Sequence, residues 1–180
     1  MTWSAYRSKV PSIMTSPDLT IRRLLPVDAA AYRDCRLDGL RSNPEAFGSS
    51  YERESPEPLE WFANRLENSH VFGAIGNDMV AGTAALAVHS GKRSHIGLLW
   101  GMFVREEYRR LGIGRKLVQA VVDVAREHVE VVQLAVISEN VAARRLYESF
   151  GFVEYGLERK ALRHGDRYYD EVLMAIDFTE

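Results

Sequence analysis

The stretch that decides the fold reads VREEYRRLGIGR and spans residues 104–115. An apolar run comes directly before it, and an amphipathic pattern typical of a helix begins at Gly112. A strand, a basic glycine-containing turn and a helix start therefore follow one another. This order directs several backbone N–H groups at one point, together with the cations Arg109, Arg110 and Arg115. The stretch predicts a site for a polyanion, most simply a phosphate group.

Length and composition indicate one ordinary globular domain. The 180 residues are 46% hydrophobic and 27% charged, which is enough to bury a hydrophobic core without disulfide bonds or structural metal ions. The net charge of −2 argues against nucleic-acid and membrane partners, so the arginines point to a small ligand. Cys35 is the single cysteine, and the five histidines lack the spacing of a zinc site, so we expect no metal. Without a signal-peptide pattern or a long apolar run, we expect a cytoplasmic protein.

Hydrophobic periodicity predicts a mixed α/β (α+β) chain. Residues 1–18 carry two prolines and are expected to be an N-terminal extension to a single domain over residues 19–180. We expect strands over residues 20–25, 70–75, 79–88, 94–104, 131–137, 152–162 and 168–178. We expect helices over residues 28–40, 55–67, 112 onward and 141–150. The β-branched run 131–137 is typical of a strand covered on both faces.

Two common nucleotide-binding motifs do not fit the glycine turn. A dinucleotide fingerprint needs a third glycine, which is missing here. A P-loop needs Lys and then Ser or Thr after its last glycine, whereas Gly114 is followed by Arg115 and Lys116. The polyanion site therefore belongs to another class.

The turn resembles the acyl-CoA-binding motif of the Gcn5-related N-acetyltransferase (GNAT) superfamily. Its pattern is Arg109-x-x-Gly112-x-Gly114, and Asn140-x-x-Ala143-x-x-x-Tyr147 resembles the second motif of that family. The resemblance covers roughly residues 20–178. It implies a GNAT fold: a mixed, mostly antiparallel sheet of six to seven strands, splayed between the fourth and fifth strands and flanked by about four helices.

The resemblance also implies roles for individual residues. Asn140 would touch the cofactor arm, and the Tyr147 phenol would protonate the leaving thiolate. A bulge at Gly101 would open the slot that receives the arm, whose backbone partners would be Met102, Phe103 and Val104. The turn would hold the pyrophosphate of acetyl-CoA through Arg109, Arg110, Leu111, Gly112, Ile113, Gly114 and Arg115.

Each of these features also has a plainer interpretation. The glycines suit an ordinary tight turn, and Arg110 suits a solvated charge. Arg115 suits a position along the helix, and Gly101 suits a site that makes room for core packing. A lone Tyr147 would normally pack on Phe150.

The acceptor side is less defined than the donor side. Family members that modify protein N-termini often carry a glutamate on the strand before the Asn helix, and the matching residue here is Ala135. No carboxylate interrupts residues 98–104 either. The proton of the incoming amine is then expected to leave through water or a loop group. The loop candidates are Tyr51, Glu52, His164 and Tyr168. The aromatic and acidic side chains of Phe47, Tyr51 and Glu52 suit a cationic amine. Alternatively, Phe47 and Tyr51 merely anchor a long loop.

The expected function is transfer of acetyl from acetyl-CoA to a primary amine of a small molecule or peptide in a ternary complex. A protein N-terminal amine is the alternative acceptor. The missing glutamate also motivates a non-catalytic acyl-CoA sensor or interaction domain. A nucleotide-binding enzyme of another class ranks last, because both nucleotide motifs fail. A homodimer is expected from family habit alone.

Overall fold

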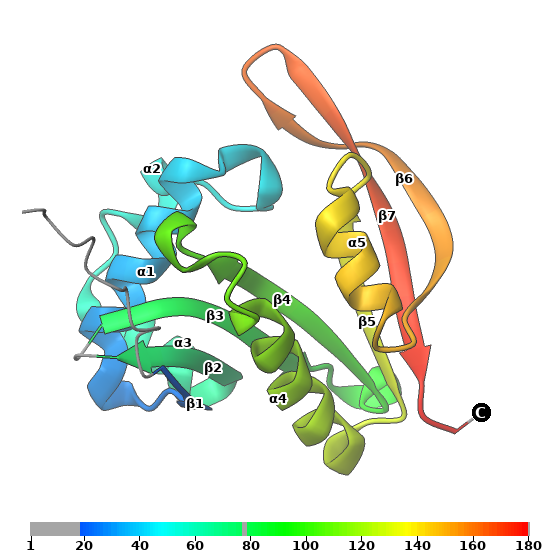
Figure 1. Ribbon diagram of the computed structural model, residues 1–180, viewed down its shortest axis with the longest axis horizontal. Helices are drawn as coiled ribbons and strands as arrows, with labels where there is room; N and C mark the ends of the chain where they lie inside the picture. The colour runs from blue at the N-terminus through cyan, green and yellow to red at the C-terminus, as the bar shows by residue number, and fades with distance from the viewer. Residues whose placement is uncertain (1–18, 77–78, 180) are drawn as a thin grey trace, which may run out of the picture.

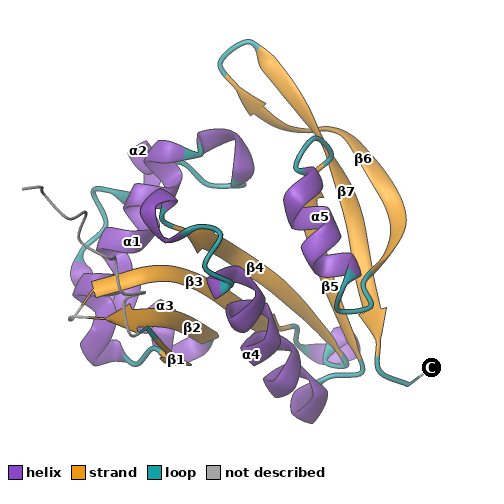
Figure 2. Ribbon diagram, viewed as in Figure 1, coloured by secondary structure: helices purple, strands orange, loops and turns teal. Residues whose placement is uncertain are grey.

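A seven-stranded sheet organises the chain in the computed structural model, which describes residues 19–76 and 79–179 (Figures 1 and 2). The extension expected over residues 1–18 lies outside the described residues. The strand order is β1-β2-β3-β4-β5-β7-β6, which confirms the mixed α/β fold. The strands are β1 (Thr20–Arg23), β2 (His70–Gly76), β3 (Met79–Val88), β4 (Ile96–Val104), β5 (Val131–Ile137), β6 (Val153–His164) and β7 (Arg167–Asp177).

The sheet splays between its fourth and fifth strands, as the family resemblance implies. All neighbouring strands pair antiparallel except β4 and β5, which run parallel. That pair is held only by Ile96–Leu98 against Val131–Gln133. Beyond this contact the two strands diverge, as the V-shaped gap in Figure 1 shows. Gly101 adopts φ +64° beside a register shift between β3 and β4, so the expected bulge is present. It lies in the part of β4 that no longer pairs with β5.

Helices cover the two faces of the sheet unequally. The helices are α1 (Ala29–Ser42), α2 (Tyr51–Glu54), α3 (Leu59–Asn68), α4 (Ile113–His128) and α5 (Val141–Glu148). One core packs α1 and α3 against β2, β3 and β4 around Tyr32 and Phe62. The other packs α4 and α5 against the opposite face and continues across β5 and β7. Among the described residues, no helix is both long and apolar enough to cross a membrane.

The prediction that β5 is covered on both faces is wrong. Val132, Leu134 and Val136 are buried against the helices, but Ala135 on the other face is exposed. The reason is that α1 and α3 pack against β2–β4, and β4 diverges from β5, which leaves this face of β5 open. The open face becomes part of the site.

The helix expected from residue 55 begins later, at Leu59, with Pro58 at its N-cap. Pro58 disfavours helical backbone at the residue before it, so the helix cannot extend back to Ser55. Ser55 instead ends the short helix α2. Asp28 does precede α1, but its carboxylate accepts from the backbone N–H of Leu25 and from Arg22 rather than from the helix.

Candidate functional site

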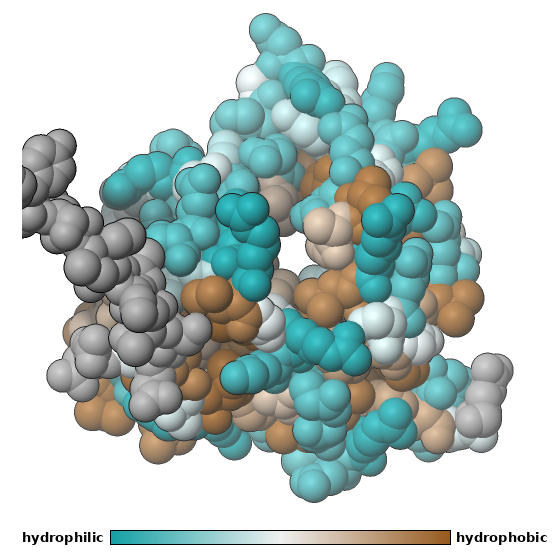
Figure 3. Space-filling view, in the orientation of Figure 1, coloured by the Kyte–Doolittle hydropathy of each residue, from teal (hydrophilic) through white to brown (hydrophobic). Residues whose placement is uncertain are grey.

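A cavity of about 480 Å³ opens where β4 and β5 separate. Its walls come from β4, β5, α5 and residues 43–47 of the segment after α1. The space-filling view shows the molecule hollowed near its centre, between the half that carries α4 and the half that carries α5 (Figure 3). The divergence of two parallel strands therefore produces a slot that reaches into the sheet.

The slot collects six of the residues expected to bind or react. Met102, Phe103 and Val104 line it from β4, and Asn140 and Tyr147 line it from the N-cap and last turn of α5. Arg109 lines it as well. The remaining turn residues lie outside this cavity, at the loop before α4 and the first turn of that helix. They are Arg110, Leu111, Gly112, Ile113, Gly114 and Arg115.

The glycine turn leaves backbone donors exposed at the start of α4. Gly112 is the N-cap residue, with φ +74°, and no side chain caps the helix there. A Cβ on Gly112 would find no other atom within 4 Å, so the space above the turn is open. Because the first N–H groups of a helix have no partner within it, this open turn can accept an anion. Gly114 lies close to the slot, since a Cβ there would stand 3.0 Å from the Met102 side chain.

The three arginines of the turn have different surroundings. Arg109 donates through Nε to the Val104 carbonyl at 3.0 Å and through Nη2 to Asn43 at 2.9 Å. Arg115 donates to the Ser149 hydroxyl at 2.9 Å. Its guanidinium also lies 5.0 Å from the Phe150 ring centre. Arg110 makes no side-chain hydrogen bond or ion pair with any described residue, so its guanidinium is the most available to a ligand.

Tyr147 is a buried phenol at the wall of the slot. It is 5% exposed and packs edge-to-face on Phe152 at 5.9 Å, not on Phe150 as the plainer interpretation expected. Phe150 lies under Arg115 instead. Burial raises the pKa of Tyr147 well above its usual value, so the phenol stays protonated at neutral pH. Its hydroxyl makes no hydrogen bond with the described residues, so its proton is free for a ligand.

Asn140 begins α5 in the expected way. Its side-chain oxygen accepts from the Ala143 backbone N–H at 3.1 Å. Gly151, with φ +95°, follows the last turn of the helix. These two signals hold α5 in the orientation that brings Tyr147 to the slot.

A second cavity, of about 550 Å³, lies against the open face of β5. It shares Trp100, Gly101 and Ala135 with the slot, so the two cavities meet at the β4–β5 gap. Charged side chains line it from several elements: Arg36, Arg53, Glu54, Arg65 and Glu171. The approach to the gap is therefore open from both sides of the sheet.

A buried ion cluster supports one wall of this second cavity. Arg36 binds both carboxylate oxygens of Glu54, at 2.9 and 2.8 Å, and Arg65 donates to the same carboxylate at 3.2 Å. Burial by itself would raise the pKa of Glu54, but the hydrogen bonds and charges of the two arginines hold it below its usual value. The cluster ties α1, α2 and α3 together.

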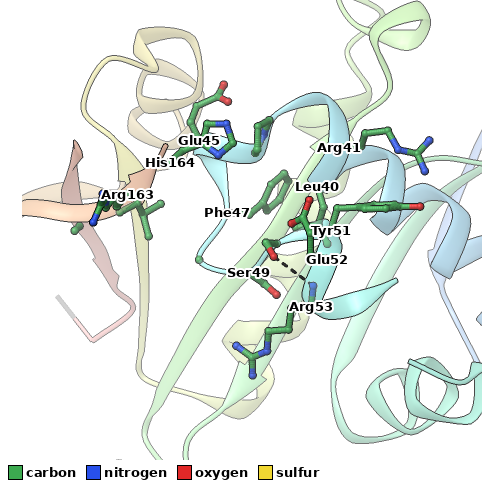
Figure 4. Close-up of a pocket in the computed structure, with 15 residues that line it drawn as sticks. Leu40, Arg41, Glu45, Phe47, Ser49, Tyr51, Glu52, Arg53, Arg163 and His164 are labelled. Carbon is green, nitrogen blue, oxygen red and sulfur yellow. Dashed lines mark hydrogen bonds between the residues drawn. The ribbon is translucent and has the colours of Figure 1, made fainter. Parts of the chain in front are cut away.

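A third cavity, of about 610 Å³, lies between residues 40–53 and the β6–β7 hairpin (Figure 4). It contains three of the expected loop candidates, Tyr51, Glu52 and His164, whereas Tyr168 is not among its lining residues. Hydrogen bonds within its own turn and to Ser50 hold the pKa of Glu52 below its usual range, with a smaller effect from the charge of His164. A carboxyl with a lowered pKa is a weak base, so Glu52 is poorly suited to taking a proton.

The sequence interpretation missed Glu171. This β7 residue lines the second cavity beside Trp100 and Ala135. The available signal was the alternation in the last strand, where buried Val172 and Met174 place Glu171 on the opposite face. That this face borders a cavity depends on the splay of the sheet.

Comparisons with known proteins agree with this geometry. The model of the acetyltransferase (GNAT) family matches residues 37–152. The chain is 38% identical over 78 residues to N-alpha-acetyltransferase 30 of Saccharomyces cerevisiae, covering 42% of this chain and 43% of that protein. It is 34% identical over 82 residues to the [ribosomal protein bS18]-alanine N-acetyltransferase of Escherichia coli K12, covering 45% of this chain and 55% of that enzyme. The matches thus span about half the length of these relatives.

Solved structures share the architecture. The Salmonella typhimurium protein yncA, solved with its cofactor acetyl-CoA, superposes with a TM-score of 0.75 over 91% of this chain and 95% of its own, at 23% identity. At that identity the likeness shows the fold, and it extends beyond the residues matched by the family model. The splayed sheet, the glycine turn before α4 and the family match together show that the chain belongs to the acetyltransferase (GNAT) family.

Proposed function

We propose that the protein transfers an acetyl group from acetyl-CoA to a primary amine of a small molecule or peptide. The observation that carries the proposal is the slot at the β4–β5 gap. There the β4 segment Met102–Val104 faces Asn140 and the protonated Tyr147, next to an uncapped helix start at Gly112. The cavity on the opposite face of the sheet gives an amine its own approach to the same gap.

Acetyl-CoA, the acetyl donor, would bind the slot through its pyrophosphate and through its amide-containing arm. The open turn at Gly112 and the free guanidinium of Arg110 suit the pyrophosphate. Backbone groups of Met102–Val104, which β5 does not pair, suit an extended amide-containing arm. The acetyl-CoA bound to yncA supports this choice of co-substrate. In line with the sequence interpretation, we infer no metal requirement.

The acceptor is proposed more broadly. The two curated relatives are named for acetylation of an N-terminal amine and of a ribosomal-protein alanine, which supports a peptide or protein N-terminal amine. The exposed Ala135 stands where family members of that type often carry glutamate, which favours a small-molecule amine or a base from elsewhere. We propose a cytoplasmic enzyme, in line with the sequence interpretation, and a homodimer as its assembly.

Thiol release separates the candidate functions. The full chain is incubated with acetyl-CoA and a panel of amino acids, polyamines and short peptides, including peptides with N-terminal alanine, and free CoA thiol is measured. Release with at least one amine is the expected result. Calorimetric binding of acetyl-CoA without release by any amine would support the non-catalytic sensor. Binding of ATP or NAD in preference to acetyl-CoA would overturn the proposal.

A further inference from the structure

The carboxylate missing from β5 has a counterpart on the neighbouring strand. In the antiparallel pairing of β5 and β7, Ala135 stands opposite Leu173 and Ile137 stands opposite Glu171. Residues opposite one another share a face, so Glu171 is the diagonal neighbour of Ala135 on the open face. Diagonal neighbours are about 7–8 Å apart, a distance that a long side chain spans. The small side chain of Ala135 leaves that space free.

Glu171 lies in the cavity through which an amine would approach. It lines the space together with Trp100, Gly101 and Ala135, which are among the residues that this cavity shares with the slot. The side chain is half-buried and makes no hydrogen bond or ion pair with the described residues. Its carboxylate is therefore available to a cation from outside.

The other charges around Glu171 do not neutralise it. Within the cavity Arg36 and Arg65 are bound to Glu54, and Arg53 is exposed at the rim. On the neighbouring strand β6, Glu158 is paired directly opposite Glu171. Burial raises the pKa of Glu171, and the like charge of Glu158 raises it further. A carboxyl shifted in this direction is a stronger base than an ordinary surface glutamate.

We propose that Glu171 binds the ammonium group of the acceptor and takes a proton from it. This inference rests on the proposed function and deepens it: the substrate class is a cationic primary amine, and the base comes from β7 instead of β5. Glu52 and His164 line the third cavity and not the two cavities that meet at the gap.

The proton and bond changes balance along this route. The ammonium R–NH₃⁺ gives one proton to the Glu171 carboxylate, and the neutral amine attacks the thioester carbonyl to form the C–N bond. The C–S bond breaks, and Tyr147 gives its proton to the leaving thiolate. The amide nitrogen loses its second proton, which returns the phenol to its neutral form, and Glu171 releases its proton to water. The sum is R–NH₃⁺ plus acetyl-CoA giving R–NH–acetyl, CoA–SH and H⁺.

The test is the pH profile of kcat/KM for an amine that the wild-type chain acetylates. For Glu171→Gln we expect a fall of about 100-fold or more and loss of the acidic limb. The affinity for acetyl-CoA and the thermal unfolding midpoint should stay as in the wild type. Glu171→Asp should retain part of the activity together with the limb. The double variant Glu171→Ala/Ala135→Glu should recover activity relative to Glu171→Ala, because the carboxylate returns to the same space from β5.

Glu158→Gln is the matched control. It removes a neighbouring carboxylate that does not line the cavity, so the plateau of kcat/KM should stay unchanged. Its acidic limb should move to lower pH, because a like charge no longer raises the pKa of Glu171. If Glu171→Gln keeps the wild-type profile, the role of Glu171 is overturned and the acetyltransferase activity stands. A wild-type chain that acetylates no amine overturns both proposals.

Discussion

At the scale of single residues, Tyr147 carries the most chemistry. Burial raises the pKa of Tyr147, so the phenol keeps its proton throughout the neutral pH range and can act as a proton donor. We predict that Tyr147→Phe lowers kcat by about 100-fold or more, because the leaving thiolate loses its proton donor. The KM for acetyl-CoA should change little. Steady-state thiol release checks this, with the exposed Tyr155→Phe as control. Unchanged kcat in Tyr147→Phe would assign the tyrosine a packing role on Phe152.

Glu54 is a residue whose contribution is to stability. Its carboxylate is buried between Arg36 and Arg65, and removing one partner of a buried pair leaves an uncompensated charge. We predict that Glu54→Gln lowers the free energy of unfolding by about 3–5 kcal/mol at pH 7. Urea unfolding measures this, with the exposed Glu60→Gln as control.

The stabilising effect of the Glu54 carboxylate decreases at acidic pH. The pKa of Glu54 is lowered by folding, so its stabilising effect is complete above the unfolded value of about 4.3 and is lost as pH falls through the folded value. The wild-type chain should therefore lose more stability than Glu54→Gln when the pH falls from 7 to below 4. Equal losses in the two proteins would show that the pair is not coupled to folding.

At the scale of elements, comparing Gly112 at the start of α4 with Gly91 distinguishes the effect of backbone strain from the effect on ligand binding. Gly112 and Gly91 both have positive φ, +74° and +63°, and a Cβ on either would meet nothing within 4 Å. We predict that Gly112→Ala and Gly91→Ala each cost about 1–2 kcal/mol of stability, because left-handed backbone strains an L-residue. Only Gly112→Ala should also weaken acetyl-CoA binding, by about tenfold or 1.4 kcal/mol.

Calorimetry on both variants checks this prediction. The difference is expected because a methyl group on Gly112 occupies the open space in which the pyrophosphate would approach the backbone, whereas Gly91 lies in the turn between β3 and β4. Equal acetyl-CoA affinities in the two variants would show that the turn at Gly112 does not hold the donor.

Elements also show where local signals were sufficient. The Asn140 cap, the Gly151 stop and the strand 131–137 depend on neighbouring residues, and the structure has them where the sequence predicts them. The start of α3 was misplaced because Ser55-Pro56 resembles a helix start, while Pro58 two residues later prevents one. The open face of β5 was also missed, since a β-branched run does not reveal which helices reach its strand.

At the scale of the whole molecule, the two halves of the sheet are joined by three residue pairs between β4 and β5 and by the core under α4. A donor bound in the slot would contact both halves and would bind only the folded chain. At 100 times its Kd, acetyl-CoA should add about 2.7 kcal/mol to the free energy of unfolding. For a chain of this size that raises Tm by roughly 5–10 °C.

Thermal unfolding with and without acetyl-CoA measures this shift, with ATP at the same concentration as control. ATP carries phosphates that the turn could bind, but it lacks the arm that fits between β4 and α5. An equal shift with ATP would indicate a general phosphate site in place of an acyl-CoA slot.

The features with local causes follow from the amino-acid sequence alone. These are the glycine turn before α4, the cap of α5, the alternation of the strands and, through two motifs, the family. Which residues face the β4–β5 gap is set by the packing of the whole fold. Burial of Tyr147, the exposed face of Ala135 and the position of Glu171 beside it depend on strand register and on how far each helix reaches across the sheet. Those quantities arise from packing between segments far apart in the chain, which no local pattern encodes.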